Sequence, residues 1–344
     1  MKRAGLIGGA VGLVAAGAAV GLATERYAIG RIRTGADPEA DEPFGRLEPD
    51  RSRIVVAADG VPLYVEEVGP VDAPLTVVFV HGYGLSMGSW HYQRRGLDDS
   101  GYRLVFYDHR SHGRSGRGPA TSSTVDQLGQ DLDTVLAELD GPVVLVGHSL
   151  GGMTIMALAE LHPELFDSTV VGVALLSTSA GMVSELKLTL PAALASIRRP
   201  IIPVLARGLT RSSALIERGR RVGSDIAWLL TRRYSFGTKD VSPTLVGYVE
   251  KMIAATPVDV IGEFLPVIMS HDKRAALPAL REVPALVMVG ERDLLTPPAH
   301  SRAIAAALPD AELVVLPSAG HLALMESAAE TNLALTTFLT GVAS

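Results

Sequence analysis

A serine stands between a predicted strand and a predicted helix, in a setting that could make its hydroxyl a nucleophile. Ser149 occupies the centre of a Gly-x-Ser-x-Gly pattern that follows the apolar run Val143–Val146. A chain that reverses direction between a strand and a helix holds the turn residue in a strained conformation, with its side chain exposed at the carboxyl end of the strand. Gly147 and Gly151 remove side chains that would collide in this turn. The Leu150 N–H, at the start of the helix, can donate to an oxygen that develops negative charge.

A serine hydroxyl needs a base to remove its proton. Among the nine histidines, His321 is the best candidate because its loop follows the predicted strand Glu312–Leu316. Open α/β sheets gather their reactive groups at the carboxyl ends of strands. His148 adjoins Ser149 in sequence, but we expect its side chain to point away across the turn. The pattern therefore predicts His321 as the base.

The base in turn needs a carboxylate that fixes its tautomer and stabilises the imidazolium. Asp293 and Glu291 both follow the predicted strand Ala285–Val289, and Asp293 is favoured because the chain must turn inward there before Pro297. Asp108 follows another predicted strand and is a further candidate. We expect Asp293 to be the partner of the base.

A second donor to a developing oxyanion should come from the loop after the predicted strand Thr76–Val80. That loop contains Gly82 and Gly84, which allow the backbone to approach a substrate closely. We expect the Tyr83 N–H to act together with the Leu150 N–H.

The elements that must position these residues alternate along the chain. A hairpin is predicted around Asp59-Gly60, and apolar runs of strand length then alternate with helical patterns. Strands buried on both faces and separated by helices predict a mostly parallel α/β sheet. The predicted core comprises residues 52–180 and 276–344.

The alternation is interrupted over residues 181–275, which contain helical patterns and almost no strand runs. We interpret this segment as a helical lid. Its Lys and Arg residues outnumber its Asp and Glu residues, which favours anionic substrates or an anionic membrane, but a solvated helical face explains the charge equally well. Aromatic residues of the lid, together with one that follows the Tyr83 loop, are expected to bind an apolar substrate, with packing between lid and core as the alternative. They are Trp90, Trp228, Tyr234 and Phe264.

The first 24 residues begin with a basic pair and continue as an uncharged run over residues 4–24, rich in Ala, Gly, Val and Leu. A helix of this length spans about 30 Å, the thickness of a bilayer core. We expect an apolar N-terminal helix that anchors the protein to a membrane, with a cleaved signal peptide and secretion as the alternative. Residues 25–51 are expected to form a linker, acidic and solvated in its second half. The orientation in the membrane stays open.

Composition excludes several classes of protein. The 344 residues carry a formal net charge of −6 and contain no Cys. The lack of Cys excludes disulfide scaffolds, thiolate metal sites and cysteine nucleophiles. The negative net charge argues against a nucleic-acid partner. The apolar share of 47% excludes a disordered chain. The oligomeric state stays open.

Five motifs together resemble those of the α/β-hydrolase superfamily. They are HGYG at 81–84, YDHRSHGRSG at 107–116, GHSLGG at 147–152, GERDLLTP at 290–297 and SAGHLALME at 318–326. The resemblance implies an eight-stranded sheet with helices on both faces and a lid inserted after strand six. Epoxide hydrolases and dehalogenases of this superfamily carry Asp at the nucleophile position, so Ser149 argues against both.

The resemblance also implies a serine hydrolase that needs no metal or organic cofactor and acts on a small-molecule acyl substrate. We expect a carboxylic ester, with a lipid or other hydrophobic ester as the more specific hypothesis. Thioesterase, amidase, C–C hydrolase and cofactor-free haloperoxidase activities use the same residues and remain alternatives. A ligand-binding protein without catalysis is a further alternative.

Overall fold

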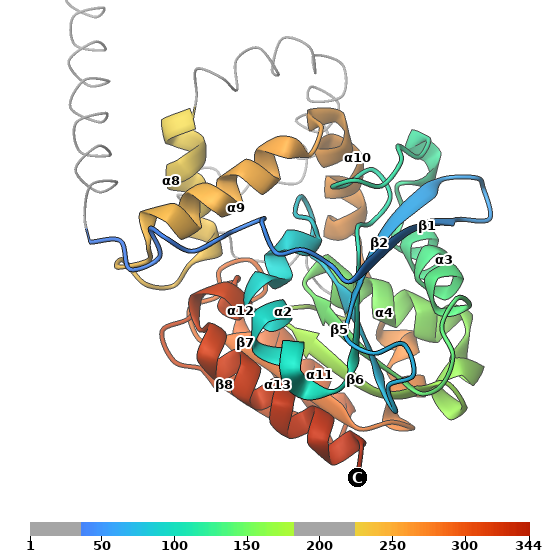
Figure 1. The fold of residues 1–344 in the computed structure, drawn as a ribbon. Helices are drawn as coiled ribbons and strands as arrows, with labels where there is room; N and C mark the ends of the chain where they lie inside the picture. The colour runs from blue at the N-terminus through green and yellow to red at the C-terminus, as the bar shows by residue number, and fades with distance from the viewer. Residues whose placement is uncertain (1–35, 182–223) are drawn as a thin grey trace, which may run out of the picture.

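The computed structural model describes residues 36–181 and 224–344 of the chain (Figure 1). Within these ranges, eight strands form one sheet, and the predicted strand positions are confirmed to within a few residues. The strands are β1 (Arg51–Val56), β2 (Pro62–Val68), β3 (Thr76–Val80), β4 (Arg103–Tyr107), β5 (Val143–His148), β6 (Val170–Leu176), β7 (Ala285–Gly290) and β8 (Glu312–Leu316).

The sheet has the order β1-β2-β4-β3-β5-β6-β7-β8. β1 pairs with β2 and β2 with β4 in antiparallel fashion, whereas all other neighbours are parallel, so the predicted mostly parallel sheet is confirmed. The predicted hairpin also forms, and Gly60 takes the positive φ of +86° in its turn. From β3 the chain continues to β4 on one side, and from β5 it continues to β6 on the other. The crevice between the carboxyl ends of two such strands is where open α/β sheets bind ligands.

Helices cover both faces of the sheet, and three more lie in the part of the segment between β6 and β7 that the structure describes. The α-helices are α2 (His91–Leu97), α3 (Val125–Leu136), α4 (Leu150–Leu161), α8 (Ser224–Ser235), α9 (Pro243–Ala255), α10 (Val258–Met269), α11 (Pro298–Ala307), α12 (Ala323–Glu326) and α13 (Ala328–Val342). Short 3-10 helices are η1 (Met87–Trp90), η2 (Asp98–Ser100), η3 (Ala120–Ser122), η4 (Pro163–Asp167), η6 (Arg274–Ala276) and η7 (Ala279–Arg281). At the C-terminal end, α12 and α13 are separated by Ser327.

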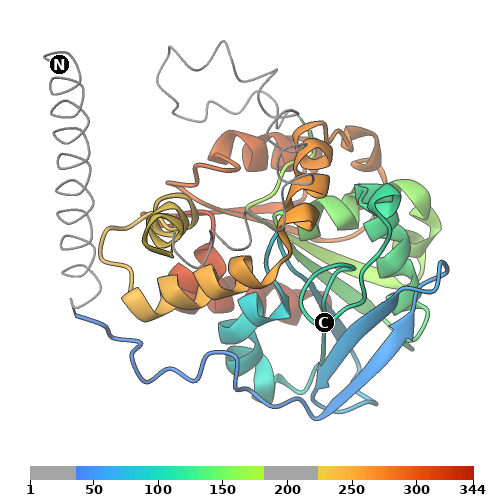
Figure 2. The same ribbon diagram turned by 90° about the horizontal axis from the view of Figure 1, so that it is seen from above.

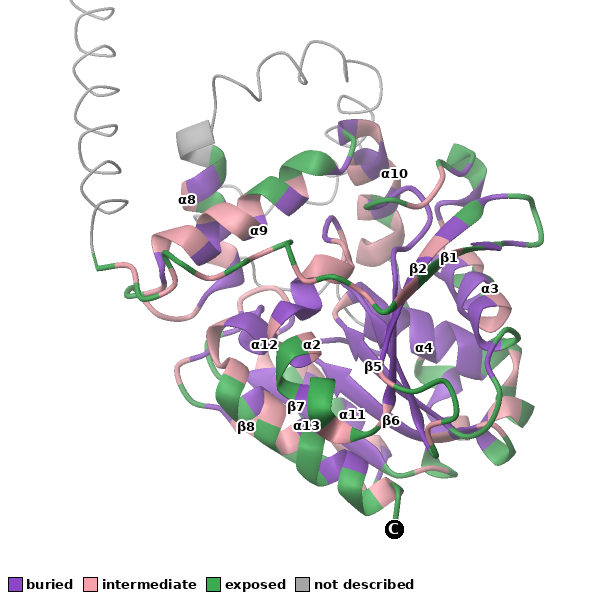
Figure 3. Ribbon diagram, in the orientation of Figure 1, coloured by how far each residue is buried: buried purple, intermediate pink, exposed green. Residues whose placement is uncertain are grey.

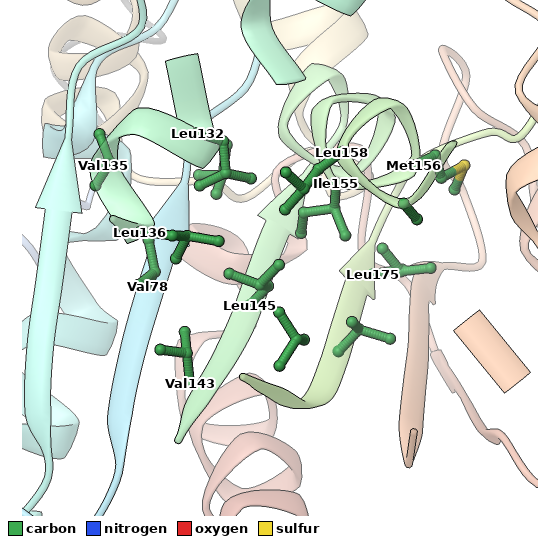
Figure 4. Packing of buried hydrophobic residues seen from close by; sticks show 14 of the residues in the cluster. Val78, Leu132, Val135, Leu136, Val143, Leu145, Ile155, Met156, Leu158 and Leu175 are labelled. Atoms are coloured by element: carbon green, nitrogen blue, oxygen red, sulfur yellow. The ribbon is translucent and has the colours of Figure 1, made fainter. Parts of the chain in front are cut away.

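The core consists of two apolar layers, one on each face of the sheet. Successive residues of a strand point to opposite faces, so Val78 packs toward α3 and α4 (Figure 4) whereas Phe79 packs in the layer that contains residues of α2 and α13. Figure 3 shows the central strands and α4 as buried. Burial on both faces explains why the central strands are continuous apolar runs rather than alternating ones.

The segment predicted as a helical lid is described from residue 224 onward. There it forms α8, α9 and α10, which confirms the predicted helical content of this part. Residues 182–223 of the predicted lid lie outside the described residues, and so does the predicted apolar helix over residues 4–24. We call the described part, residues 224–275, the insertion. Its action as a lid stays a prediction.

Residues 36–50 correct the expectation of a solvated linker. This segment runs alongside α2 and α9 in both Figure 1 and Figure 2. Asp37 accepts hydrogen bonds from the start of α9, and Glu42 lies 2.7 Å from the ring of His91 in α2. The acidic composition of this segment predicted a solvated chain. Such a composition carries no local signal of the groups that the segment contacts in the folded protein.

Within the two described ranges, no single helix combines the length and the apolar composition needed to cross a bilayer. α9 and α10 have the required length and apolar composition only when taken together, and the two helices are bent by 94° relative to each other.

Candidate active site

Ser149 occupies the sharp turn between β5 and α4. Its backbone has φ +53° and ψ −114°, a conformation that is strained for any residue other than glycine. The flanking glycines are required by space: a Cβ on Gly151 would lie 2.0 Å from the Val80 carbonyl oxygen, and one on Gly147 would lie 2.7 Å from the Gly151 backbone. The turn therefore presents the Ser149 side chain at the carboxyl end of β5, as the sequence pattern predicts.

Three side chains that are far apart in sequence meet at this turn. The Ser149 hydroxyl lies 3.0 Å from Nε2 of His321, and Nδ1 of His321 lies 2.9 Å from Oδ2 of Asp293. The structure thus brings the predicted nucleophile, base and carboxylate into one hydrogen-bonded line. Each comes from the carboxyl end of a different strand: β5 for Ser149, β7 for Asp293 and β8 for His321.

Asp293 is buried, and every partner that it has favours its ionised form. The backbone N–H groups of Leu295 and Thr296 donate to Oδ1 at 2.8 and 2.9 Å, and the Thr296 hydroxyl lies 2.9 Å from Oδ2. Burial alone would raise the pKa of Asp293, but His321 and these hydrogen bonds outweigh it and hold the pKa below its ordinary value. Asp293 is therefore a carboxylate that can orient the His321 imidazole. The contacts of Thr296 with Asp293 were not predicted, because the only local signal of Thr296 is its place three residues after Asp293.

The other two candidate carboxyl groups lie elsewhere. Glu291 is exposed. Asp108 is buried, accepts hydrogen bonds from the Met87 and Arg114 amides at 2.8 and 2.7 Å, and makes no contact with His321. Burial raises the pKa of Asp108 to about 6. Asp108 braces two loops instead of orienting the base.

The two amides predicted to bind an oxyanion are both available at the site. Tyr83 follows β3 and Leu150 begins α4, and among the described residues neither backbone N–H has a hydrogen-bond partner. Both residues line the same cavity as Ser149. The Tyr83 hydroxyl donates to the Ile261 carbonyl of α10, which ties this loop to the insertion.

His148 corrects a further expectation, because it does not point away from the site. Its Nε2 lies 3.0 Å from the carbonyl oxygen of His321, and the two rings are 4.9 Å apart. Burial lowers the pKa of His148 to about 3, so the ring is neutral and Nε2 carries the proton that it donates. His148 therefore supports the backbone of the predicted base.

A cavity of about 260 Å³, which we call the serine cavity, opens beside Ser149 and His321. Its wall is largely apolar, and no Asp, Glu, Lys or Arg of the described residues contributes to it. The lining residues are Gly82, Tyr83, Leu85, His148, Ser149, Leu150, Met153, Ser235, Ile253, Leu265, Ile268, Met269, Leu295, Thr296, His321 and Leu322.

The structure places none of the four expected substrate-binding aromatics on this wall. Trp90 is fully buried beside Phe79, and Trp228 is buried in the same apolar layer. Phe264 is fully buried in a separate apolar cluster with residues of α3 and α4. Tyr234 is half-buried, and it is its neighbour Ser235 that reaches the cavity. The alternative, packing between insertion and core, describes these residues better because aliphatic side chains of α9 and α10 line the cavity instead.

Among the residues that the structure describes, no three His, Asp or Glu side chains are grouped as a metal site requires. The expectation of a cofactor-free reaction stays a prediction.

The fold and this site define an α/β protein in which a serine on a strand-to-helix turn is paired with a histidine and a carboxylate. The chain belongs to the alpha/beta hydrolase fold family, whose family model matches residues 76–328.

Relatives within this family carry several names. The chain is 37% identical over 99 residues to a non-heme chloroperoxidase of Streptomyces lividans, covering 28% of this chain and 35% of the relative. It is 27% identical over 263 residues to an sn-1-specific diacylglycerol lipase of Mus musculus, and the match covers 73% of this chain and 76% of the lipase. The matched segment thus spans only about a third of the chloroperoxidase.

Solved structures share the fold. A thermophilic esterase from Thermogutta terrifontis superposes with a TM-score of 0.67 at 27% identity, covering 86% of this chain and 100% of the esterase.

Proposed function

We propose that this protein is a serine hydrolase that cleaves carboxylic esters through an acyl-enzyme on Ser149. The observation that carries the proposal is the unbroken line of hydrogen bonds from Ser149 through His321 to Asp293, which ends at an apolar cavity. Relatives named as an esterase and a lipase support the same class of reaction.

The reaction proceeds in two halves. The Ser149 oxygen attacks the ester carbonyl carbon while its proton passes to Nε2 of His321, 3.0 Å away. The Tyr83 and Leu150 amides stabilise the resulting oxyanion. His321 then gives the proton to the departing alcohol, which leaves the acyl group on Ser149. A water molecule, deprotonated by His321, attacks this acyl-enzyme and releases the carboxylic acid, and the proton returns to Ser149.

Asp293 stabilises the imidazolium that exists during both halves. It accepts a hydrogen bond from the Nδ1–H of His321, which fixes Nε2 as the atom that faces Ser149. The carboxylate keeps its charge in this buried position because Leu295, Thr296 and His321 donate to it.

The serine cavity favours an uncharged, apolar acyl group. Aliphatic residues of α9 and α10 line it together with Ser149, namely Ile253, Leu265, Ile268 and Met269. Each methylene that moves from water into such a wall contributes about 0.8 kcal/mol to binding. A carboxylate or ammonium on the substrate would lose its hydration there without a charged partner. This supports a hydrophobic, lipid-like ester over a short or charged one.

The test is labelling by a fluorophosphonate probe together with hydrolysis of p-nitrophenyl esters from acetate to palmitate. We expect labelling and hydrolysis of the wild type, and loss of both in Ser149→Ala, with kcat/KM reduced about 10⁴- to 10⁶-fold. Ser168→Ala is the matched control, because Ser168 is exposed and precedes β6 at the opposite end of the sheet. A folded wild type that neither reacts with the probe nor hydrolyses any ester would overturn the proposal and favour a non-catalytic binding protein.

A cofactor-free haloperoxidase reaction is the second candidate, because a relative is named a non-heme chloroperoxidase. Thioesters, amides and lactones belong in the same screen. Peroxide-dependent bromination of an indicator dye that exceeds ester hydrolysis in turnover, and that is lost in Ser149→Ala, would favour the second candidate.

Membrane attachment through residues 4–24 is also a proposal, supported by the length and composition of that run. Fractionation of cells that express the full chain or a chain lacking residues 1–24 tests it. We expect the full chain in the membrane fraction and the shortened chain in the supernatant. A mature N-terminus beyond residue 16 would indicate a cleaved signal instead.

A further inference from the structure

Residues 37–47, which we call the strap, contact both the core and the insertion. Figure 1 and Figure 2 show the strap passing alongside α2 of the core and α9 of the insertion. Three of its carboxylates and one aromatic ring make these contacts. They are Asp37, Glu39, Glu42 and Phe44.

At one end, Asp37 fastens the strap to the start of α9. Its carboxylate accepts hydrogen bonds from the Ser242 hydroxyl, from the Thr244 N–H at 3.2 Å and from the Thr244 hydroxyl at 2.6 Å. Ser242 is the N-cap of α9, where a negative charge is favoured by the helix dipole. Partial burial would raise the pKa of Asp37, but these hydrogen bonds hold it below its ordinary value.

Further along, the strap is fastened to α2. Glu42 lies 2.7 Å from Nε2 of His91 and also pairs with Arg95, while Glu39 accepts a hydrogen bond of 2.7 Å from the Tyr92 hydroxyl. Glu39 and Glu42 thus attach the strap to one side of the core.

Phe44 links the two attachments. Its ring stacks on Tyr248 of α9 at 4.6 Å between centroids, and it lies 4.7 Å from the ring of His91 in α2. One strap side chain therefore touches both the core helix and the insertion helix.

α9 and Thr256, the residue that follows it, in turn hold the loop that carries the Tyr83 amide. The Tyr248 hydroxyl donates to the Gly88 carbonyl at 3.1 Å, and the Thr256 hydroxyl donates to the Gly84 carbonyl at 3.2 Å. A Cβ on Gly88 would lie 2.5 Å from the Tyr248 hydroxyl, so the loop backbone packs directly against this side chain.

We infer that the strap positions the oxyanion loop, residues 82–88, by holding α9 at a set distance from α2. The inference rests on the proposed role of the Tyr83 amide. The loop keeps core contacts that do not involve the strap: the Gly84 N–H donates to His112 at 3.2 Å, and the Met87 N–H donates to Asp108 at 2.8 Å. Loosening the strap therefore displaces the loop without unfolding it, and the effect is smaller than the loss of a whole oxyanion donor.

The experiment compares Asp37→Ala with Asp41→Ala. Asp41 is an exposed acid in the same strap, and its carboxylate has no partner among the described residues. We expect faster amide hydrogen exchange in residues 82–90 and 243–256 of Asp37→Ala alone. We also expect kcat to fall about 3- to 30-fold with a smaller change in KM, below the ~10²- to 10³-fold loss for removal of one oxyanion donor.

A double-mutant cycle then tests the route through α9. Thr244→Val removes the hydroxyl that Asp37 binds, so its effect on exchange and kcat should not add to that of Asp37→Ala. Exchange in Asp37→Ala that equals exchange in Asp41→Ala would overturn the inference. A wild type without ester hydrolysis would count against the proposed function only, because the exchange measurement needs no substrate and still decides whether the strap holds α9 and the loop.

Discussion

Two cavities of the described structure differ in what their polar groups are bound to. The serine cavity has an apolar wall, and its Ser149–His321 pair faces the space beside it. The second, of about 160 Å³, lies beneath the strap, and we call it the strap cavity. It is rich in charge and is lined by Gly45, Leu47, Glu66, Ser86, Met87, Gly88, Trp90, His91, Arg94, Phe106, Asp108, Gly113, Arg114 and Tyr248.

The carboxylates of the strap cavity have partners that the protein itself supplies. Glu66 pairs with Arg94 at 2.6 Å and with Arg114 at 2.8 Å, and Asp108 accepts two backbone hydrogen bonds. A buried carboxylate whose partners are all supplied by the protein braces structure and has little capacity left for a substrate. Charge in a cavity is therefore a weak indicator of chemistry. A nucleophile and base that face an apolar space are a stronger one, because electrostatic interactions strengthen where water is excluded.

The largest expected effect separates the two buried aspartates. Asp293→Asn should lower kcat about 10³- to 10⁴-fold, because an amide cannot stabilise the imidazolium and favours the wrong tautomer of His321. Asp108→Asn should lower it less than about tenfold, because the amide oxygen can still accept one of the two backbone hydrogen bonds. Steady-state hydrolysis of p-nitrophenyl butyrate measures both. Equal losses in the two variants would mean that the strap cavity takes part in the chemistry.

An intermediate effect is expected from a charge placed in the apolar wall. Ile268→Glu should lower kcat/KM for a decanoate ester about 10- to 100-fold and for an acetate ester much less, because the long chain loses its apolar contact and meets an unpaired charge. Competition between the two esters in one reaction gives the ratio directly.

The matched control is Ile54→Glu, a change of the same kind at an exposed position of β1. It should leave the decanoate-to-acetate ratio unchanged. A ratio that moves equally in both variants would show that the serine cavity does not receive the acyl chain.

The smallest effect on activity is expected from substitution of Asp108, which should instead change how the free energy of unfolding depends on pH. The pKa of Asp108 is about 6 in the folded protein against an ordinary 3.8, because burial disfavours the charged form. Asp108 therefore stabilises the fold most below about pH 4, and this contribution is lost as the pH rises to about 6. The loss amounts to at most ~3 kcal/mol of the free energy of unfolding.

Urea denaturation of the wild type and Asp108→Asn between pH 3.5 and 7 checks this expectation. As the pH rises across that window, the free energy of unfolding of the wild type should fall relative to that of Asp108→Asn. Free energies that change in parallel with pH in the two proteins would contradict the raised pKa. A group that braces the strap cavity should affect the free energy of unfolding and barely affect turnover, which distinguishes it from a group of the serine cavity.

Much of the fold was predictable because its signals are local. The apolar runs of β3 and β8 have the same bounds in the structure as in the sequence pattern. The turn at Ser149 carries its own signature in the flanking glycines. Gly151 is required because a Cβ at this position would lie 2.0 Å from the Val80 carbonyl oxygen. Asp293 and His321 were predictable because each follows a strand whose carboxyl end must lie at the same edge of the sheet.

The misplaced residues share a different physical origin. Trp90 and Phe264 are apolar, and an apolar side chain is as well accommodated in the core as on a cavity wall, so residue type does not decide between them. His148 could point to either side of its turn, and only the position of the His321 carbonyl favours one.

Local sequence specifies the succession of strands and helices along the chain and the residues that can act as nucleophile, base and carboxylate, because periodicity, glycine sterics and side-chain chemistry are properties of short segments. The wall of the serine cavity, the contact of His148 with His321 and the attachment of the strap to α2 and α9 follow from the fold alone. These depend on how segments far apart in the sequence pack together, from 49 residues between Glu42 and His91 to 207 between Asp37 and Thr244, and no local pattern encodes that packing.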